Sequence, residues 1–321
     1  MKYRTYLATA LLAFMSVGTH AADAYPSKPI DLIIPYAAGG TTDIIGRVLA
    51  KKLTKTLGET VIVENKDGAN SMIGTALVAH AAPDGYTLLL TSDVVVINEF
   101  LYKHPTYHAL TDLTPIAPVV TTPYFMMVNS KLPVKSVADF VNYAKSKPGQ
   151  VAFGSSGMGG TPHLVGELFQ ERTGTKLLHV AYRGTGPATV DLAAGRVQAM
   201  FVGLPAVEPL VRAGTVRVLA TAENERSPQM PQLATIKEDG FPGVAAGNWF
   251  GVLGPAGMPP AVVKRISDAI TEISKTDEFR KSMESLGAEP MISTPEAFDA
   301  KYKTDRERWG KLIQDNHLTL D

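Results

Sequence analysis

Apolar residues in the first third of the chain alternate between short continuous runs and stripes at helical spacing. Residues 30–34 form an apolar run, and residues 42–57 carry apolar side chains at intervals of three and four, which predicts a strand followed by an amphipathic helix. Residues 60–64 and 86–91 are predicted as the next strands, with a helix over residues 71–82 between them. This alternation is typical of an α/β fold with right-handed crossovers and a largely parallel, doubly wound sheet.

The same alternation returns in the middle of the chain. The predicted strands there are residues 151–154, 178–182, 197–202 and 216–221. The predicted helices between them are residues 161–174, 187–194 and 205–214. After Pro255 the spacing predicts helices almost throughout, with one apolar stripe over residues 262–273 and a last helix that opens at Thr294.

Two extended segments, residues 122–128 and 249–253, flank this middle block and are expected to cross between two lobes. A chain of 321 residues is long enough for two cores. We therefore predict an α/β architecture of two lobes, each a doubly wound, mostly parallel sheet flanked by helices. The first lobe would comprise residues 25–123 and 247–321 and the second residues 124–246. A cleft is expected at the carboxyl ends of their strands.

Residues 1–24 have the pattern of an export signal. Basic residues precede a short apolar run at residues 7–17, and small residues favour cleavage after Ala21 or Ala24. The apolar run is too short to span a bilayer. The chain has no cysteine, which a lipoprotein anchor would require, so we expect a mature protein free in the periplasm.

Composition narrows the class of partner and of chemistry. The 31 basic residues balance 31 acidic ones, whereas a nucleic-acid-binding surface needs a basic excess. Ser155 and Ser156 lack the G-x-S-x-G spacing of a nucleophile elbow. His163 and Glu167 are one helical turn apart, but a third metal ligand is not evident nearby in the sequence. We therefore expect no catalytic residue, no metal and no cofactor.

The loop between the first strand and the first helix has the features of an anion site. Residues 35–43 contain two adjacent glycines and open a helix, so unpaired N–H groups face outward at the positive end of the helix dipole. The lysine of a nucleotide phosphate loop is missing, which favours a carboxylate over a triphosphate. The predicted ligand-binding residues are Tyr36, Ala37, Ala38, Gly39, Gly40 and Thr41. Asp43 is expected to interact with the helix dipole.

A second loop with hydroxyl groups and glycines precedes the first helix of the middle block. Its predicted ligand-binding residues are Ser155, Ser156, Gly157 and Thr161. Tyr182, Arg183 and Gly184 end the next strand, and the anion would be held either by the Arg183 guanidinium or by the N–H groups of Gly184 and Thr185. Ser92, after the third strand, either lines the cleft or packs in the core.

Several short motifs lie in a characteristic order across the mature chain. They are Tyr25-Pro26-Ser27-Lys28-Pro29, residues 35–43, Ala82-Pro83-Asp84-Gly85-Tyr86, Ser155-Ser156-Gly157, Thr161-Pro162-His163, Tyr182-Arg183-Gly184 and Arg308-Trp309-Gly310. In this order they resemble the substrate-binding proteins of tripartite tricarboxylate transporters, the Bug-type periplasmic receptors. The resemblance implies a periplasmic-binding-protein (flytrap) architecture that closes on a small organic acid. It also implies that inner-membrane permease subunits receive the ligand.

The sequence departs from this family at two places. Many relatives have an acidic residue near the position of Val202, suited to the ammonium group of an amino acid, and here the residue is apolar. We therefore expect a ligand without an amino group, a di- or tricarboxylate or an aromatic carboxylate, that contacts the neighbouring Gly203. Asn70 and Ser71 replace a glycine-rich run, so part of the pocket wall of the first lobe is expected to differ.

These features together predict a monomeric receptor rather than an enzyme, with a small organic acid as its ligand. Two alternatives remain at the level of sequence. One is a receptor that serves a signalling sensor instead of a permease, and the other, with less support from the residues, is an exported hydrolase.

Overall fold

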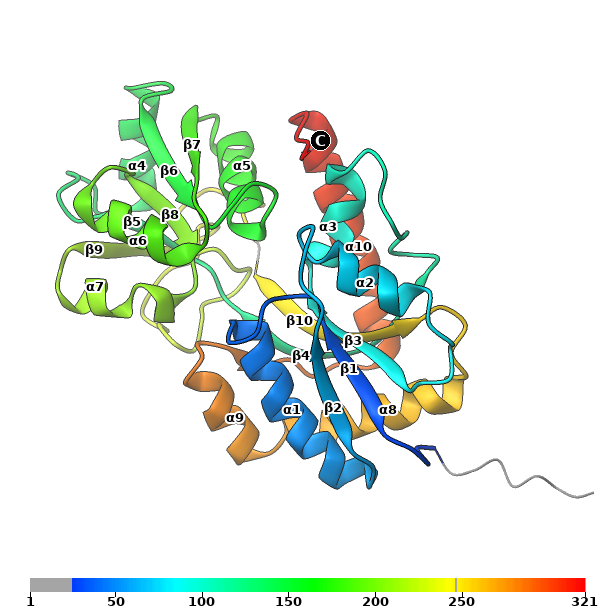
Figure 1. Ribbon diagram of the computed structural model, residues 1–321. Coiled ribbons are helices and arrows are strands. Elements are labelled where there is room, and N and C mark those ends of the chain that lie inside the picture. The colour runs from blue at the N-terminus through cyan, green and yellow to red at the C-terminus, as the bar shows by residue number, and fades with distance from the viewer. Residues whose placement is uncertain (1–24, 246, 321) are drawn as a thin grey trace, which may run out of the picture.

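The computed structural model describes residues 25–245 and 247–320, which form two lobes side by side (Figure 1). Within these residues, the sheet of the first lobe has strand order β11-β4-β10-β3-β1-β2 and that of the second has order β7-β6-β8-β5-β9. The first sheet contains β1 (Ile30–Ile34), β2 (Val61–Asn65), β3 (Thr87–Ser92), β4 (Leu113–Thr122), β10 (Asn248–Pro255) and β11 (Glu289–Pro290). The second contains β5 (Phe125–Asn129), β6 (Val151–Ser155), β7 (Leu177–Ala181), β8 (Ala199–Val202) and β9 (Val216–Thr221).

Helices cover both faces of each sheet. The first lobe has α1 (Thr41–Leu57), α2 (Met72–Ala79), α3 (Val94–Leu101), α8 (Pro260–Ser274), α9 (Asp277–Glu284) and α10 (Pro295–Asp315). The second has α4 (Val137–Lys145), α5 (Thr161–Thr173), α6 (Thr185–Ala194), the short 3-10 helix η1 (Leu204–Ala206) and α7 (Glu208–Arg212). The predicted fold class, an α/β protein with two sheets flanked by helices, is confirmed.

Strand pairing differs from the expected mostly parallel sheets, because each sheet is mixed. In the first lobe β1 pairs in parallel with β2 and β3, whereas β10 pairs antiparallel with β3 and β4. In the second lobe β6 pairs in parallel with β7 and β8, and β5 pairs antiparallel with β8 and β9. Strands β5 and β10 follow the two crossings, where the chain enters a sheet from the other lobe rather than through a helical crossover, and β11 adds a further antiparallel pair with β4.

The crossing segment expected at residues 122–128 is divided in the structure. Strand β4 ends at Thr122 and β5 begins at Phe125, so the chain passes between the sheets at Pro123 and Tyr124. The return crossing lies between the end of β9 and the start of β10.

Alternate residues of β1 supply the two faces of the first lobe. Leu32 and Ile34 pack with Ile45 and Leu49 of α1, while Ile33 belongs to the core on the opposite face. Helix α1 lies close to β1, since a Cβ built on Gly46 would stand 2.4 Å from Ile34 Cδ1. This packing fixes the loop that joins the two elements.

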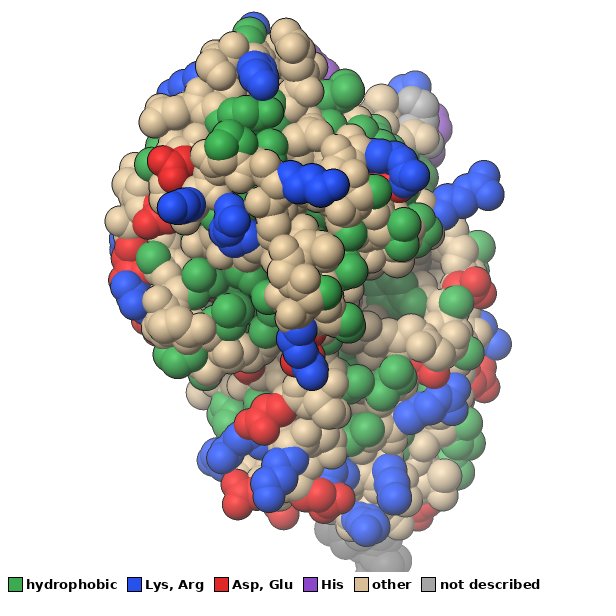
Figure 2. Space-filling view, turned by 90° about the vertical axis from the view of Figure 1, so that its left-hand side faces the viewer, with side chains coloured by type: hydrophobic (Ala, Val, Ile, Leu, Met, Phe, Trp, Pro, Cys, Tyr) green, Lys and Arg blue, Asp and Glu red, His purple; other side chains and the backbone are tan. Residues whose placement is uncertain are grey.

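Charged side chains of both signs are mixed over the face shown in Figure 2, on the upper and the lower lobe alike. No helix among residues 25–245 and 247–320 is both long and apolar enough to cross a membrane. The predicted export signal at residues 1–24 lies outside the described residues.

Candidate functional site

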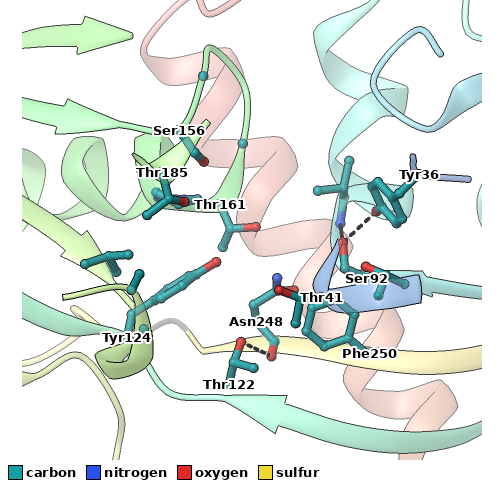
Figure 3. A pocket seen from close by; sticks show the side chains of 18 of the residues that line it. Tyr36, Thr41, Ser92, Thr122, Tyr124, Ser156, Thr161, Thr185, Asn248 and Phe250 are labelled. Atoms are coloured by element: carbon teal, nitrogen blue, oxygen red, sulfur yellow. Dashed lines mark hydrogen bonds between the residues drawn. The ribbon is translucent and has the colours of Figure 1, made fainter. Parts of the chain in front are cut away.

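A cavity of about 360 Å³ lies between the lobes, and both contribute to its walls (Figure 3). The first lobe and the crossings supply Tyr36, Thr41, Thr42, Asn70, Ser92, Val94, Thr122, Tyr124, Asn248, Phe250, Leu286 and Gly287. The second lobe supplies Ser156, Gly157, Met158, Gly160, Thr161, Pro162, Thr185, Val202, Gly203, Pro205 and Ala206. Hydroxyl, amide and apolar groups line this cleft, and none of its lining residues in the described part of the chain is acidic or basic.

Three helices begin beside the cleft, and each begins at a glycine. The N-cap residues are Gly40 for α1, Gly160 for α5 and Gly184 for α6, and no side chain caps any of these three helices. The first-turn N–H groups of a helix lack intrahelical acceptors, and the helix dipole places partial positive charge on them. Thr41, Thr161 and Thr185, the first residues of these helices, all line the cleft. The cleft therefore offers a charge-free set of donors suited to an anion.

Asp43 organises the first-lobe loop. Its Oδ2 accepts hydrogen bonds from the Gly39 N–H at 2.9 Å and from Arg47 Nε at 3.0 Å, and its Oδ1 accepts one from Asn65 Nδ2 at 3.0 Å. Asn65 Nδ2 also donates to the carbonyl of Tyr36 at 3.0 Å. The hydrogen bond from Arg47, followed by those from Gly39 and Asn65, holds the pKa of Asp43 below its usual range against the effect of burial. Asp43 is therefore an ionised anchor of the loop.

The predicted residues of the first-lobe loop are only partly brought to the cleft. Tyr36 and Thr41 line it, whereas the residues between them, Ala37 to Gly40, are exposed and do not. The Tyr36 hydroxyl is 2.9 Å from Ser92 Oγ, and burial raises the pKa of Tyr36, so the phenol stays neutral. Ser92 lines the cleft as well as being buried. The two alternatives for Ser92 thus coexist.

The second-lobe loop separates into residues that face the cleft and a residue that supports them. Ser156, Gly157 and Thr161 line the cleft, but Ser155 is fully buried. Ser155 Oγ lies 2.9 Å from the carbonyl oxygen of Gly157 and 2.7 Å from His179 Nε2. Its hydroxyl therefore holds the loop in shape.

The contact between Ser155 and His179 is the nearest approach to a nucleophile–base pair in the second lobe. Burial, and then the neighbouring His163, lowers the pKa of His179 to about 4, so its ring is neutral. The two imidazole rings stack with centroids 3.8 Å apart, and neither Ser155 nor His179 lines the cleft. A serine that no substrate in the cleft can reach does not support the hydrolase alternative.

The strand end at Tyr182, Arg183 and Gly184 lies beside the cleft without lining it. The Tyr182 hydroxyl donates to Asp191 Oδ2 at 2.8 Å, and the Gly184 N–H donates to the carbonyl of Ser156 at 3.0 Å. Arg183 is exposed and is not among the lining residues. The next residue, Thr185, does reach the cleft, as does the predicted Gly203 with its neighbour Val202.

Asn70 enters the cleft from an unusual stretch of backbone. Ala69, Asn70 and Ser71 have φ values of 44°, 50° and 76°, a conformation that glycine adopts most easily. The Asn70 side chain donates to Asn98 Oδ1 at 2.7 Å, and Asn98 Nδ2 donates back to the Asn70 carbonyl at 2.5 Å. These bonds stabilise the left-handed turn where the sequence has no glycine.

Sequence reasoning missed the floor of the cleft. This floor is formed by the end of β4, the first crossing and the start of β10, which lie together in Figure 3. Its residues are Thr122, Tyr124, Asn248 and Phe250, and Thr122 Oγ1 donates to the Asn248 carbonyl at 3.3 Å. Their adjacency depends on the pairing of β4 with β10 across more than a hundred residues. A local pattern does not show it.

Comparison with known proteins agrees with this geometry. The model of the tripartite tricarboxylate transporter family receptor matches residues 45–318. Protein BugT of Bordetella pertussis is 36% identical over 302 residues, which cover 94% of this chain and 93% of that protein.

Three solved structures are similar over nearly the whole chain. R. palustris Rpa4515 with adipate has a TM-score of 0.78 at 32% identity, covering 92% of this chain and 99% of that one. The periplasmic binding protein BugD has a TM-score of 0.75 at 34% identity, with the same coverage of 92% and 99%. MatC from Rhodopseudomonas palustris with bound malate has a TM-score of 0.74 at 27% identity, covering 90% and 100%. The family and these neighbours are binding proteins rather than enzymes, and this chain belongs to the tripartite tricarboxylate transporter receptor family.

Proposed function

We propose that this receptor captures a small organic carboxylate without an amino group in the cleft between its lobes. The observation that carries the proposal is the convergence of the uncapped starts of α1, α5 and α6 on a cleft without charged lining residues in the described chain. Each helix end contributes about 0.3–1 kcal/mol toward an anion, and more where the site is partly buried. Hydroxyl groups such as that of Ser156 add hydrogen bonds to a charged acceptor, each worth about 1.5–3 kcal/mol.

The composition of the walls supports the absence of an amino group. Val202 is 5% exposed and lines the cleft together with Val94, Met158 and Phe250. An ammonium group enclosed by these side chains would lack a carboxylate partner, and an unpaired buried charge is strongly unfavourable. Adipate and malate, named with two of the similar structures, are dicarboxylates that carry no amino group. A di- or tricarboxylate or an aromatic carboxylate fits these walls best.

Closure of the lobes would complete the site. In this proposal residues 25–123 and 247–321 move against residues 124–246 about the crossings at Pro123–Tyr124 and between β9 and β10. A ligand favours closure only when it binds the closed form better, and donors from both lobes provide that preference. The mature protein would act as a monomer in the periplasm after removal of residues 1–24 and would deliver its ligand to the permease of a tripartite tricarboxylate-type transporter.

A carboxylate panel tests the proposal. Calorimetry with the mature protein would compare adipate, malate, citrate and benzoate with aspartate and glutamate. We expect binding within the first group and none in the second. Tight binding of aspartate or glutamate alone would contradict the proposed ligand class.

Ser156→Ala tests the site itself. Loss of one hydroxyl donor to an anion should weaken the bound carboxylate at least about tenfold. Ser282→Ala is the matched control, because Ser282 on α9 is partly exposed, does not line the cleft, and its hydroxyl donates to the Glu278 carbonyl. Equal affinities of the two variants would remove the second-lobe loop from the site.

A further inference from the structure

Several side-chain hydrogen bonds join the lobes, such as that from Gln229 to the Gly287 carbonyl, and one of them is buried between the second-lobe loop and α3. Thr161 Oγ1, at the start of α5 in the second lobe, donates to Asp93 Oδ1 at 2.9 Å, and Asp93 directly precedes α3 in the first lobe. Thr161 is 2% exposed and Asp93 is 1% exposed. Thr161 lines the cleft, whereas Asp93 does not. Asp93 can therefore affect lobe closure without touching a ligand.

The same loop meets the first lobe a second time. A Cβ built on Gly159 would stand 2.5 Å from Leu101 Cδ1 and 3.2 Å from Leu320 Cδ1. The Leu320 N–H donates to the Leu101 carbonyl at 2.9 Å, which ties the C-terminal segment to the end of α3. The contacts of Thr161 and Gly159 thus dock residues 156–161 against both ends of α3. This docked arrangement is what a closed cleft requires.

Asp93 is left without a counter-ion in this position. Its Oδ2 is buried and has no hydrogen-bond partner among the described residues. The charged groups that face it come from α10, and Lys301 and Arg308 there are engaged with Asp305 at 3.0 and 3.1 Å.

Tyr124, from the crossing, and Tyr36, from the first-lobe loop, are the other titratable groups close to Asp93. Burial raises the pKa of Asp93 to about 7, and it outweighs the Thr161 hydrogen bond and the two cations, while Asp305 acts in the same direction as burial.

We propose that Asp93, docked against Thr161, is a proton-dependent latch: the closed cleft buries the Asp93 carboxyl group, which favours closure when that group carries a proton and opposes closure when it is ionised and has no counter-ion. The latch rests on the proposed receptor function for its effect on ligand capture, but not for its effect on closure. In an open form Asp93 would meet water, and its pKa would return toward the ordinary value of about 3.9.

The direction of the pH dependence follows from proton linkage. The closed form binds the proton more tightly, so acid favours closure, and the advantage is lost as the pH rises through the closed-form pKa of about 7. Between pH 8 and pH 6 the ratio of closed to open protein should rise about tenfold.

The test measures closure without any ligand. Because the chain has no cysteine, Lys55→Cys on α1 and Lys145→Cys on α4 provide two exposed labelling sites, one in each lobe. Single-molecule energy transfer at pH 6 and pH 8 should show the roughly tenfold change in the ratio of closed to open protein. Asp93→Asn keeps the shape and an acceptor for Thr161 but cannot ionise, so it should remain closed at both pH values. Asp93→Ala should be more open at both.

A carboxyl control makes the result specific. Glu225→Gln removes an exposed carboxylate and should leave the pH response unchanged. Glu223, at the return crossing, is the other carboxyl group whose pKa burial raises to about 7, and it is retained in Asp93→Asn, so that variant tests Asp93 alone. If Asp93→Asn keeps the tenfold response, or the wild type shows none, the latch is overturned. The comparison of the pH response of wild type with that of Asp93→Asn tests the latch even where Asp93→Ala fails to fold.

A separate adipate and malate titration distinguishes the two proposals. If the closed-to-open ratio does not respond to pH but the protein still binds the carboxylates, the latch is wrong and the proposed ligand class stands. A pH response in a protein that binds none of the carboxylate panel removes the ligand class and leaves the latch.

Discussion

Replacing Asp43 by alanine separates two accounts of the first-lobe loop. If Asp43 acted only on the helix dipole, its removal would cost about 0.3–1 kcal/mol of the free energy of unfolding. The structure instead shows a carboxylate that is 3% exposed and accepts hydrogen bonds from Gly39, Asn65 and Arg47.

Hydrogen bonds to a charged acceptor contribute about 1.5–3 kcal/mol each, and water can replace part of this because Gly39 is exposed and Asn65 is half-buried. The ion pair with Arg47 adds little, because the Arg47 side chain is 54% exposed. We therefore expect Asp43→Ala to lose about 2–4 kcal/mol in total.

Urea unfolding at pH 7 measures this loss, and Asp268→Ala is the matched control. Asp268 also has a cation four residues away, Lys264, but both side chains are largely exposed, so its loss should cost less than about 0.5 kcal/mol. The folded protein holds the pKa of Asp43 below its unfolded-state pKa of about 3.9. The stabilisation that Asp43 provides is therefore complete above the unfolded-state pKa and is lost as the pH falls through the folded-state pKa. The gap between wild type and Asp43→Ala should therefore narrow in acid. A variant no less stable than Asp268→Ala, or a gap unchanged at pH 2, would refute the reasoning.

Three further substitutions test other parts of the site. Val202→Asp places a carboxylate where the cleft wall is apolar, so calorimetry should show aspartate or glutamate binding at least about tenfold tighter than to wild type, and unchanged selectivity would contradict the role of Val202. Ser155→Ala should lower the unfolding free energy by about 1–3 kcal/mol, whereas Ser156→Ala should mainly lower ligand affinity; the reverse order would show that the two serines have been assigned the wrong roles. Asp305→Ala removes the acceptor of Trp249 Nε1 at 2.9 Å and leaves Lys301 and Arg308 of α10 without their carboxylate partner. Denaturant unfolding should therefore show a loss of about 3–5 kcal/mol in the free energy of unfolding, and a loss below about 1 kcal/mol would refute this.

The first βα unit was predictable, because β1 is a continuous apolar run and α1 is amphipathic with a clear stop, whereas α4 at the start of the second lobe was missed. Helix α1 ends at Gly58, which has a φ of 89°, as the glycine indicated. Strand β4 was missed because Pro115 and Pro118 read as loop residues. In the structure β10 pairs with both prolines at register shifts in the ladder, where a missing N–H is tolerated.

Helix α3 was missed for a different reason. Its sequence opens with three valines and an isoleucine, which favour a strand, and these four residues are all buried, so no polar face reveals a helical period. Tertiary contacts, rather than local sequence preference, determine whether such a segment becomes a helix or a strand. Among them is the Tyr107 hydroxyl, which donates to the Val95 carbonyl at 2.8 Å.

The site shows what a sequence can specify about donors and what it cannot. Gly39 and Ser155 have suitable groups, yet Asp43 takes the N–H of one and His179 contacts the hydroxyl of the other. Competition within the fold decides which donors remain for a ligand, and that competition is not visible in a local pattern. The N-cap glycines carry a clearer signal. A serine, threonine or aspartate at an N-cap would satisfy a first-turn N–H with its own side chain, whereas glycine leaves it for another acceptor. Three helices of sufficient length that begin at glycine, rather than the number of hydroxyl groups nearby, are therefore the stronger indication of an anion site in this chain.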